Sequence, residues 1–276
     1  MDYKRGIDVS QWQGVIDWAA VKASGIEFAM IRAGYGQNNI DPRWKRNADE
    51  CTRLGIPFGV YWFSYALNVD MARREAQYCI QAIKPYNLDY PVAFDFEYDS
   101  VETAQDAGVY VTKELASDIT RAFCEEIRAA GYTPIVYANP DYLSRYFDAG
   151  IASRYDIWLA QWPYTPDLNN PPRDCDMWQY SSSGSVNGIT GRVDMNVCYT
   201  DYEGDENMTV ERFAQLMDEY RKMLQAKPAS SWAQGAMDWA VSTGLIKGGD
   251  GGNTMPQDFL TREQFATVMQ RYDSRK

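Results

Sequence analysis

Apolar residues follow two different rhythms along the first 200 residues of the chain. Short, nearly continuous apolar runs, typical of buried strands, alternate with longer stretches in which apolar residues recur at helical spacing. Repeated strand–helix units with such apolar strands predict a parallel sheet. The predicted strands span residues 5–9, 28–33, 58–64, 91–97, 134–138, 157–161, 177–180 and 192–195, and the predicted helices lie near 17–24, 43–54, 69–84, 111–130 and 140–147.

The number and spacing of these strands indicate a barrel. Eight strands suffice to close one, but the later strands are separated by too little chain to hold full helices. We therefore expect an irregular, TIM-like β/α barrel in which some helices are missing near the C-terminal end.

The character of the chain changes after about residue 204, where strand-forming residues become rare and helical spacing dominates. Residues 209–220 and 261–272 repeat Thr, Glu, Phe, Ala, Met and Tyr in register at an offset of 52 residues. Each copy begins with a Thr suited to cap a helix and places Phe, Met and Tyr on one face. The chain is thus expected to contain a barrel domain, residues 1–204, and a small all-helical module, residues 205–276.

The charge of the chain narrows the range of partners. It carries 38 acidic and 27 basic side chains, a net charge of −11. Residues 205–276 hold 10 of the acidic and 9 of the basic side chains, which leaves 28 and 18 for residues 1–204. A nucleic acid or an anionic lipid surface requires a basic footprint, so neither is expected as a partner.

Composition also bears on the chemistry and on the compartment. The chain has no histidine, which excludes Ser-His-Asp and Cys-His catalysis and argues against His-ligated zinc. Its five cysteines form no CxxC pair, and whether Cys175 and Cys198 pair stays open. No apolar run resembles a signal peptide or a membrane span, so we expect synthesis in a cytoplasm without an export signal, and no membrane insertion.

Acidic side chains stand at the ends of three predicted strands. The strand at residues 91–97 ends in Asp95 and Glu97, which share one face because alternate strand residues point the same way. Asp8 and Asp194 each stand alone among apolar residues at other predicted strand ends. In a β/α barrel such ends meet at one rim, where repulsion and burial would raise a pKa, as a general acid requires.

Two kinds of chemistry suit this group of carboxyls. Paired carboxyls flank the scissile bond in glycoside hydrolysis, whereas carboxylates without histidine also suit Mg²⁺ or Ca²⁺. The nine Trp and twenty Tyr residues favour a carbohydrate ligand, since sugars stack on aromatic rings, but a large aromatic core would explain them equally well. Composition and spacing leave both chemistries open.

Segments spread over residues 5–200 carry a more specific signal. They are residues 6–14 (GIDVSQWQG), 28–36 (FAMIRAGYG), 59–64 (GVYWFS), 94–97 (FDFE), 134–139 (PIVYAN), 157–162 (IWLAQW), 177–180 (MWQY) and 193–196 (VDMN). In sequence and order they resemble glycoside hydrolase family 25, the lysozymes common among phage endolysins and bacterial autolysins. The resemblance implies a flattened, incomplete β/α barrel that hydrolyses the β-1,4 bond between N-acetylmuramic acid and N-acetylglucosamine in peptidoglycan, with no cofactor and no metal.

The same resemblance implies roles for individual residues. Glu97 would be the general acid, Asp95 would assist the substrate's 2-acetamido group, and Asp8 and Asp194 would complete an acidic floor. The acetamido oxygen is favoured as the nucleophile of a retaining reaction, with direct attack by Asp95 as the competing version. The side chains expected to contact substrate are Tyr61 and Tyr137, lining the subsite of the cleaved sugar, and the stacking candidates Trp12, Tyr35, Trp62, Trp158 and Trp178.

The C-terminal module resembles a single S-layer homology motif through residues 231–240 (SWAQGAMDWA), 244–249 (GLIKGG) and 260–266 (LTREQFA). Such motifs bind secondary cell-wall polymers, usually as three copies. A single copy implies either a wall-polymer partner or a homo-oligomer with helix faces meeting across subunits. A helical module that only packs on the barrel is the simpler alternative.

These expectations combine into a two-part cell-wall hydrolase that acts on the wall after release, either a phage endolysin or a bacterial autolysin. Two other classes stay open. One is a non-catalytic protein that binds cell-wall glycan, and the other is a metal-dependent hydrolase that uses the same carboxylates.

Overall fold

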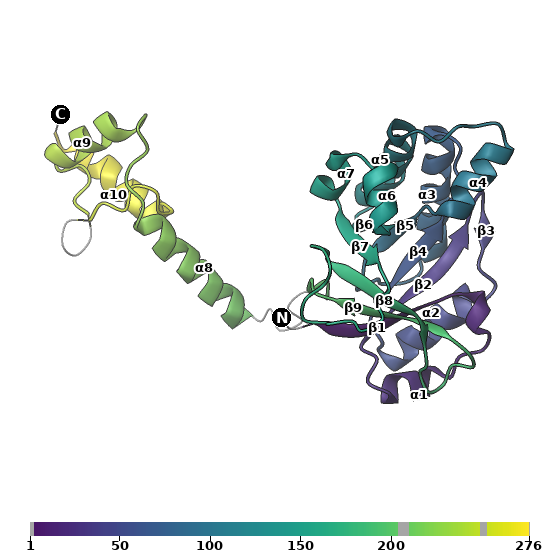
Figure 1. Cartoon of the computed structure of the whole chain (residues 1–276). Helices are drawn as coiled ribbons and strands as arrows, with labels where there is room; N and C mark the ends of the chain where they lie inside the picture. The colour runs from purple at the N-terminus through teal and green to yellow at the C-terminus, as the bar shows by residue number, and fades with distance from the viewer. Residues whose placement is uncertain (1–2, 204–209, 249–252, 276) are drawn as a thin grey trace. The chain divides into compact units, whose positions relative to one another are not determined.

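The structure is a computed structural model that describes residues 3–203, 210–248 and 253–275. The chain divides into two compact units, Met1–Gly204 and Asp205–Lys276, and each is described by itself (Figure 1). Within the described ranges, no helix is long and apolar enough to cross a membrane.

The first unit is built on a closed barrel of eight strands. Around the barrel the strands follow the order β1-β9-β8-β7-β6-β5-β4-β2, and the pairing of β2 with β1 closes the ring. A two-residue strand, β3, pairs only with the end of β2. The predicted irregular β/α barrel is therefore confirmed. The strands are β1 (Lys4–Val9), β2 (Phe28–Tyr35), β3 (Asn39–Ile40), β4 (Phe58–Phe63), β5 (Val92–Asp95), β6 (Pro134–Ala138), β7 (Asp156–Ala160), β8 (Met177–Gly184) and β9 (Val193–Cys198).

Strand β9 departs from the predicted parallel sheet. The strands from β1 through β2 and β4 to β8 are all parallel, but β9 runs antiparallel to both of its neighbours. Only residues 185–192 connect β8 to β9, and this is too short for the crossover that a parallel pair requires. The two strands consequently form a hairpin.

Helices surround the barrel between β1 and β7 (Figure 1). From β7 to residue 203 the described chain forms no further helix, which agrees with the short spacing of the late strands. The sequence pattern did not predict α4, α7 or the short 3-10 helix after β1. The elements are the 3-10 helix (Gln11–Gln13), α1 (Trp18–Ala23), α2 (Trp44–Leu54), α3 (Val69–Ile83), α4 (Tyr98–Asp106), α5 (Lys113–Ala129), α6 (Pro140–Arg145) and α7 (Ala149–Arg154).

Two apolar layers hold the first unit together. The larger layer packs the outward residues of the strands, such as Ile31 and Trp62, against the helices. The smaller one fills the barrel interior and includes Phe28 and Trp158. Gly6 makes room for the interior packing, because a Cβ atom there would lie 2.4 Å from the Phe28 ring. The lower part of the barrel is thus filled with side chains, and only the rim is available for chemistry.

The second unit contains α8 (Val210–Gln225), α9 (Gln234–Ser242) and α10 (Arg262–Asp273). A bidentate ion pair joins Arg221 of α8 to Asp258, with nitrogen–oxygen distances of 3.1 and 3.0 Å. Arg271 of α10 donates to the Leu245 carbonyl oxygen at 3.0 Å, beyond the end of α9. Polar links therefore account for much of the connection between these helices.

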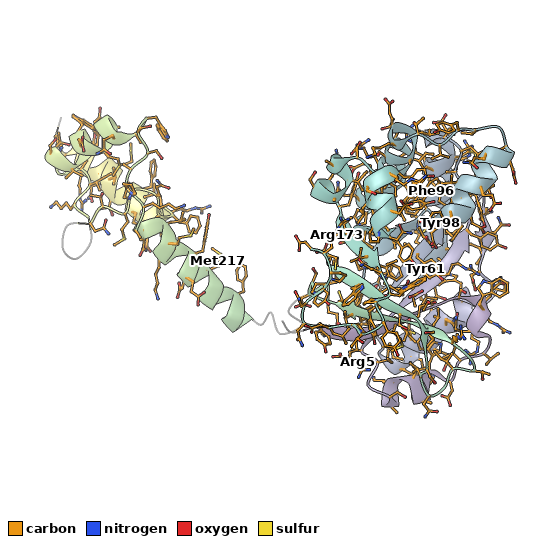
Figure 2. All side chains as sticks on the ribbon, in the orientation of Figure 1. Arg5, Tyr61, Phe96, Tyr98, Arg173 and Met217 are labelled. Atoms are coloured by element: carbon orange, nitrogen blue, oxygen red, sulfur yellow. The ribbon has the colours of Figure 1, made fainter. Side chains whose placement is uncertain are left out.

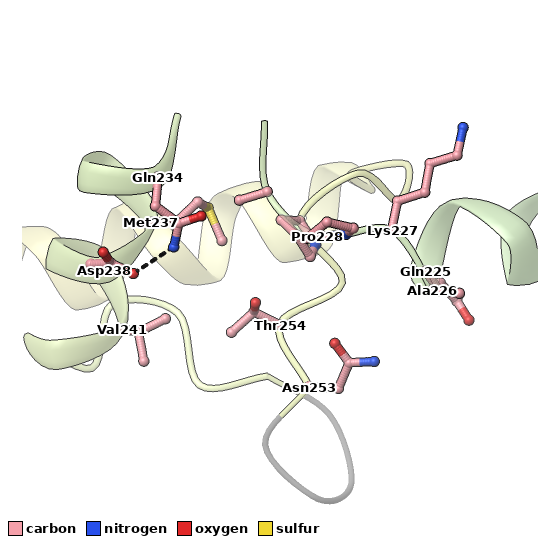
Figure 3. Close-up of a pocket in the computed structure, with 12 residues that line it drawn as sticks. Gln225, Ala226, Lys227, Pro228, Gln234, Met237, Asp238, Val241, Asn253 and Thr254 are labelled. Carbon is pink, nitrogen blue, oxygen red and sulfur yellow. Dashed lines mark hydrogen bonds between the residues drawn. The ribbon is translucent and has the colours of Figure 1, made fainter. Parts of the chain in front are cut away.

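A hollow of about 370 Å³ lies in the second unit between the end of α8, α9 and the segment after residue 253 (Figure 3). Its lining is mostly polar, and Asp238 on its wall accepts a hydrogen bond from Gln234 at 2.9 Å. Among the residues that line this hollow, Lys227 has the single basic side chain.

Candidate active site

Four carboxyl side chains gather at the rim of the barrel where the parallel strands end; we call Asp8, Asp95, Glu97 and Asp194 the carboxyl cluster. Asp8 lies near the end of β1, and Asp95 is the last residue of β5. Asp194 is the second residue of β9, and because β9 is antiparallel its beginning lies at this same rim. In the β1–β9 pair, Asp8 and Asp194 stand directly opposite each other.

Asp95 and Glu97 form the central pair of the carboxyl cluster. Their carboxyls are joined by a hydrogen bond, which requires that one of the two carries a proton. Burial raises the pKa of both groups. The charge of Glu97 and the hydrogen bond between the carboxyls raise the pKa of Asp95 further, whereas the same hydrogen bond lowers the pKa of Glu97. The pair therefore favours a state with one shared proton, held mainly by Asp95.

The two members of this pair differ in exposure. Asp95 is only 5% exposed, and its Oδ1 atom has no hydrogen-bond partner within the described residues. Glu97 is half-buried and precedes the first residue of α4, where its N–H donates to Ser100 Oγ at 3.0 Å. The next residue in the chain, Tyr98, is exposed (Figure 2). Glu97 is thus the carboxyl that solvent or a ligand reaches first.

Asp8 is fixed from below by two amides. Gln179 Nε2 and Asn196 Nδ2 each donate to Asp8 Oδ2 at 2.8 Å. Burial, with the charge of Asp194 opposite, still raises the pKa of Asp8 to about 8. Burial also raises the pKa of Asp194, to about 6. These two acids therefore change protonation between about pH 6 and about pH 8.

Three aromatic rings support the carboxyl cluster. The Trp158 ring lies beneath Tyr61 and Tyr137, with centroid distances of 6.1 and 4.9 Å and edge-to-face geometry. Tyr137 donates its hydroxyl to Gln179 Oε1 at 3.0 Å, and Trp158 Nε1 donates to Asn196 Oδ1 at 2.8 Å. The polar atoms of Tyr137 and Trp158 are thus hydrogen-bonded to the two side-chain amides that bind Asp8, which fixes the positions of both amides.

The structure separates the predicted stacking residues into different groups. Trp12, on the 3-10 helix after β1, is 78% exposed and offers a free face. Tyr35 is half-buried, with the Arg32 guanidinium 5.5 Å above its ring. Trp158 is only 2% exposed, so it supports the rim instead of stacking on a sugar.

Trp62 and Trp178 were predicted to contact substrate, and this prediction is wrong. Both are at most 1% exposed and belong to the layer between barrel and helices. Their indole nitrogens donate to the carbonyl oxygens of Gly36 and Gln161 at 3.2 and 2.8 Å. A ring buried on both faces has no surface for a sugar.

Sequence reasoning missed three polar residues and one aromatic residue of this rim. Gln179 and Asn196 bind Asp8, and both lie inside the segments that resemble the family, where their alternation with apolar residues was a signal. Trp162 is 56% exposed and donates to Gln179 Oε1 at 3.0 Å. Its exposed ring follows β7 and is a second candidate platform for a sugar.

Arg32 is the missed cation. Its Nε donates to Asp41 Oδ2 at 2.8 Å, and its Nη2 is buried without a partner in the described chain. Its positive charge opposes the rise in the pKa of Asp95. Asp41 also accepts from the Gln11 N–H at 3.0 Å and so ties Arg32 to the 3-10 helix that carries Trp12.

The carboxyl cluster contains the oxygen ligands that hard cations prefer. Within the described residues, no three Asp, Glu, Cys or His side chains are grouped closely enough to bind one ion. One oxygen of Asp8 is already occupied by two amides, which a metal ligand would have to release. The geometry thus gives no support to a carboxylate-bound cation here.

Known proteins share both parts of this architecture. The family model for glycosyl hydrolases family 25 matches residues 7–189, and the model for the S-layer homology domain matches residues 226–266. YegX of Escherichia coli strain K12, itself uncharacterised, is 30% identical over 77% of this chain and 73% of its own length. Lysozyme M1 of Streptomyces globisporus is 28% identical over 70% of this chain and 66% of its own.

A solved structure has a similar fold. The modular autolysin LytC of Streptococcus pneumoniae superposes with a TM-score of 0.61 at 31% identity, over 71% of this chain. The chain covers 47% of that structure, about half of its length. Fold and rim together define the first unit as an irregular β/α barrel with a carboxyl cluster at its rim. The chain belongs to glycosyl hydrolases family 25 and carries a C-terminal S-layer homology domain.

Proposed function

We propose that the chain hydrolyses the β-1,4 bond between N-acetylmuramic acid and N-acetylglucosamine in bacterial peptidoglycan. The observation that supports this most directly is the hydrogen-bonded pair of Asp95 and Glu97, whose pKa values are both raised. A carboxyl that keeps its proton near neutral pH is what a glycosidic leaving oxygen needs. The lysozyme and the autolysin among its relatives support the choice of substrate.

Glu97 is the general acid in this proposal. It is the more exposed member of the pair and lies at the mouth of the rim, whereas Asp95 is buried beneath it. Glu97 gives its proton to the leaving oxygen as the bond from that oxygen to C1 of the muramic acid unit breaks. Its carboxylate then takes a proton from the water that attacks C1, which restores the starting state.

The nucleophile is the substrate's own acetamido oxygen. Carboxyls that hydrogen-bond directly leave no room for a water between them, unlike the separation of about 6.5–9.5 Å in inverting enzymes. Asp95 also lies on the same side as Glu97 and is poorly placed to attack the opposite face of the sugar. Asp95 instead accepts the acetamido N–H, once the shared proton has passed to Glu97, and so orients the oxygen that forms the bond to C1. The water that attacks C1 then displaces this oxygen, which breaks the new bond and restores the acetamido group.

Asp8 and Asp194 act on this pair through their charge. The charge of Asp194 raises the pKa of Glu97 and that of Asp8, and Asp8 in turn raises the pKa of Asp95. The exposed rings of Trp12 and Trp162 then provide stacking surfaces for neighbouring sugars.

The decisive test compares the wild type with Glu97→Gln for release of reducing ends from purified peptidoglycan, with and without EDTA. The variant keeps the shape and removes the proton, so its activity should fall by a factor on the order of 10²–10⁴. Ser183→Ala, an exposed position on β8, serves as the matched control and should retain activity. Undiminished activity in Glu97→Gln would refute the assignment, and loss with EDTA that Mg²⁺ restores would favour metal-dependent hydrolysis. A wild type that binds glycan without cutting it would indicate a binding protein.

The second unit attaches the enzyme to the cell wall in this proposal, and the match to the S-layer homology domain supports it. The test measures co-sedimentation of Glu97→Gln with intact walls and with walls stripped of secondary polymers. Binding should fall on stripped walls. Equal binding to both would assign wall attachment to the barrel alone.

A further inference from the structure

We propose that copies of this chain associate with one another through the apolar helix faces of the second unit. Besides Tyr272, eight large side chains of this unit are between 47% and 65% exposed. We call them the apolar surface: Phe213, Tyr220, Met223, Trp239, Phe259, Leu260, Phe265 and Met269.

The second unit lacks the core that would make it stable alone. In its described part, Leu224, Ala240 and Leu245 are the only apolar side chains that are buried. A domain of this size normally has to bury most of its large apolar side chains to offset the conformational entropy of folding. The apolar side chains that should form a core are present but uncovered, so a partner is needed to bury them.

Helix α8 has an apolar face that is mostly exposed. Phe213, Met217, Tyr220 and Leu224 recur at the spacing that places them on one face. Exposure along this face falls from 56% at Phe213 and 48% at Tyr220 to 9% at Leu224. The ring of Phe259 lies 6.1 Å from that of Tyr220, and the helix extends beyond this contact away from α9 and α10 (Figure 1). Most of the face is therefore available to another molecule.

One part of the apolar surface repeats within each chain. The α10 residues Phe265 and Met269, 55% and 49% exposed, repeat the spacing of Phe213 and Met217 in α8. A surface that fits one face of this kind also fits the other, so a copy of the chain presents a matching partner for each helix.

The exposed area agrees with a stable interface. A large side chain offers roughly 200 Å², so eight that are about half exposed leave roughly 800 Å². This is about the area that each partner contributes to a protein–protein interface of standard size.

Charge favours a second copy of this unit over the barrel as the occupant. Residues 205–276 hold 10 acidic and 9 basic side chains, so two such units meet without net repulsion. The barrel domain holds 28 acidic and 18 basic side chains, so its net charge has the same sign as that of the second unit and does not attract it. Its exposed large apolar residues are mostly Trp and Tyr, with Val15 and Ile40 as the aliphatic members in the described part.

Sedimentation velocity of the full chain, from about 1 to about 100 μM, tests the proposal. The wild type should form a species of two or more chains that grows with concentration. The double substitution Phe265→Lys with Met269→Lys should weaken association by at least about tenfold, because it places two charges in the interface. Thr267→Lys with Gln270→Lys, exposed positions on the opposite side of α10, is the matched control and should associate like the wild type.

Each outcome decides the question. A wild type that stays a single chain at the highest concentration overturns the proposal, and so does an assembly that both lysine pairs leave intact. If circular dichroism shows that the Phe265→Lys and Met269→Lys chain has lost helix, the pair Phe265→Ala with Met269→Ala replaces it and must also weaken association. Release of reducing ends is measured in parallel, so a failure here is distinguishable from a failure of the proposed hydrolysis.

Discussion

Glu75 lies in the middle of α3 and is fully buried, yet no ion pair in the described chain involves it. Its Oε1 accepts hydrogen bonds from Gln37 Nε2 at 3.1 Å and from the Tyr65 N–H at 3.2 Å. Its Oε2 is buried without a donor among the described residues. The side chain thereby joins the segment after β4 to the segment after β2. The Ser64 N–H beside this junction donates to the Asp95 carbonyl oxygen at 2.7 Å, so Glu75 supports the rim from behind.

The protonation of Glu75 should make the barrel less stable as pH rises. Burial raises the pKa of Glu75 from 4.5 to about 7 in the folded protein. The folded state prefers the protonated form, so this stability is fully present below pH 4.5 and is lost as pH rises through about 7. Because one pKa unit corresponds to about 1.4 kcal/mol, the loss amounts to about 3 kcal/mol.

The substitution Glu75→Gln isolates this effect. Its amide oxygen still accepts from Gln37 and Tyr65, but it does not ionise. At about pH 5 the free energies of unfolding of the two chains should agree within about 1 kcal/mol, and at about pH 8 the variant should be more stable by about 3 kcal/mol. Urea unfolding of the barrel, followed by fluorescence of its buried Trp residues, measures both differences.

Comparing the two chains at each pH cancels the contribution of the carboxyl cluster, which both contain. Glu102→Gln, at an exposed position of α4, is the control and should change the free energy of unfolding by no more than about 0.5 kcal/mol at either pH. A difference between wild type and Glu75→Gln that is the same at both pH values would refute the reasoning. It would mean that burial does not keep Glu75 protonated.

Three further predictions concern the rim and the core behind it. Asp194→Asn removes the negative charge that raises the pKa of Glu97, so the high-pH limb of kcat/KM on peptidoglycan should move to lower pH; an unmoved limb would exclude Asp194 from control of the acid. Trp12→Ala should raise KM by an amount equivalent to about 1 kcal/mol with little change in Tm, because that ring is exposed. Trp178→Ala should instead cost about 3–5 kcal/mol of stability, and a normal Tm in that variant would contradict its place in the core.

The strands were predictable because each is a short apolar run, and the closed barrel followed from their number and spacing. The sequence also allows a prediction of whether each strand side chain points into or out of the barrel. Adjacent strand residues point to opposite faces, so Tyr61 and Trp62 could not both line the rim. The same argument separates Trp178 from Gln179. Predicting Trp62 and Trp178 as substrate contacts ignored this alternation.

Other features depend on contacts that no single segment encodes. The strand predicted at residues 91–97 ends at Asp95, and Glu97 precedes α4. The two carboxyls meet nevertheless, because the backbone stays extended through Glu97, with φ −124° and ψ −169°, before the helix begins at Tyr98. Helix α4 itself was missed because residues 98–106 mix acidic and apolar residues without a long apolar face, and only Ser100, Val101 and Ala104 are buried.

The direction of β9 determines the electrostatics of the rim. Because β9 returns antiparallel, its first residues lie where the other strands end, and Asp194 comes opposite Asp8. Asn196, two residues further along the same face, then reaches one layer deeper, where it bonds both Asp8 and Trp158. A parallel β9 would place Asp194 at the far end of the barrel and leave Glu97 without the charge that raises its pKa. The short connection after β8 therefore acts on the proposed general acid, although no residue in that connection belongs to the carboxyl cluster.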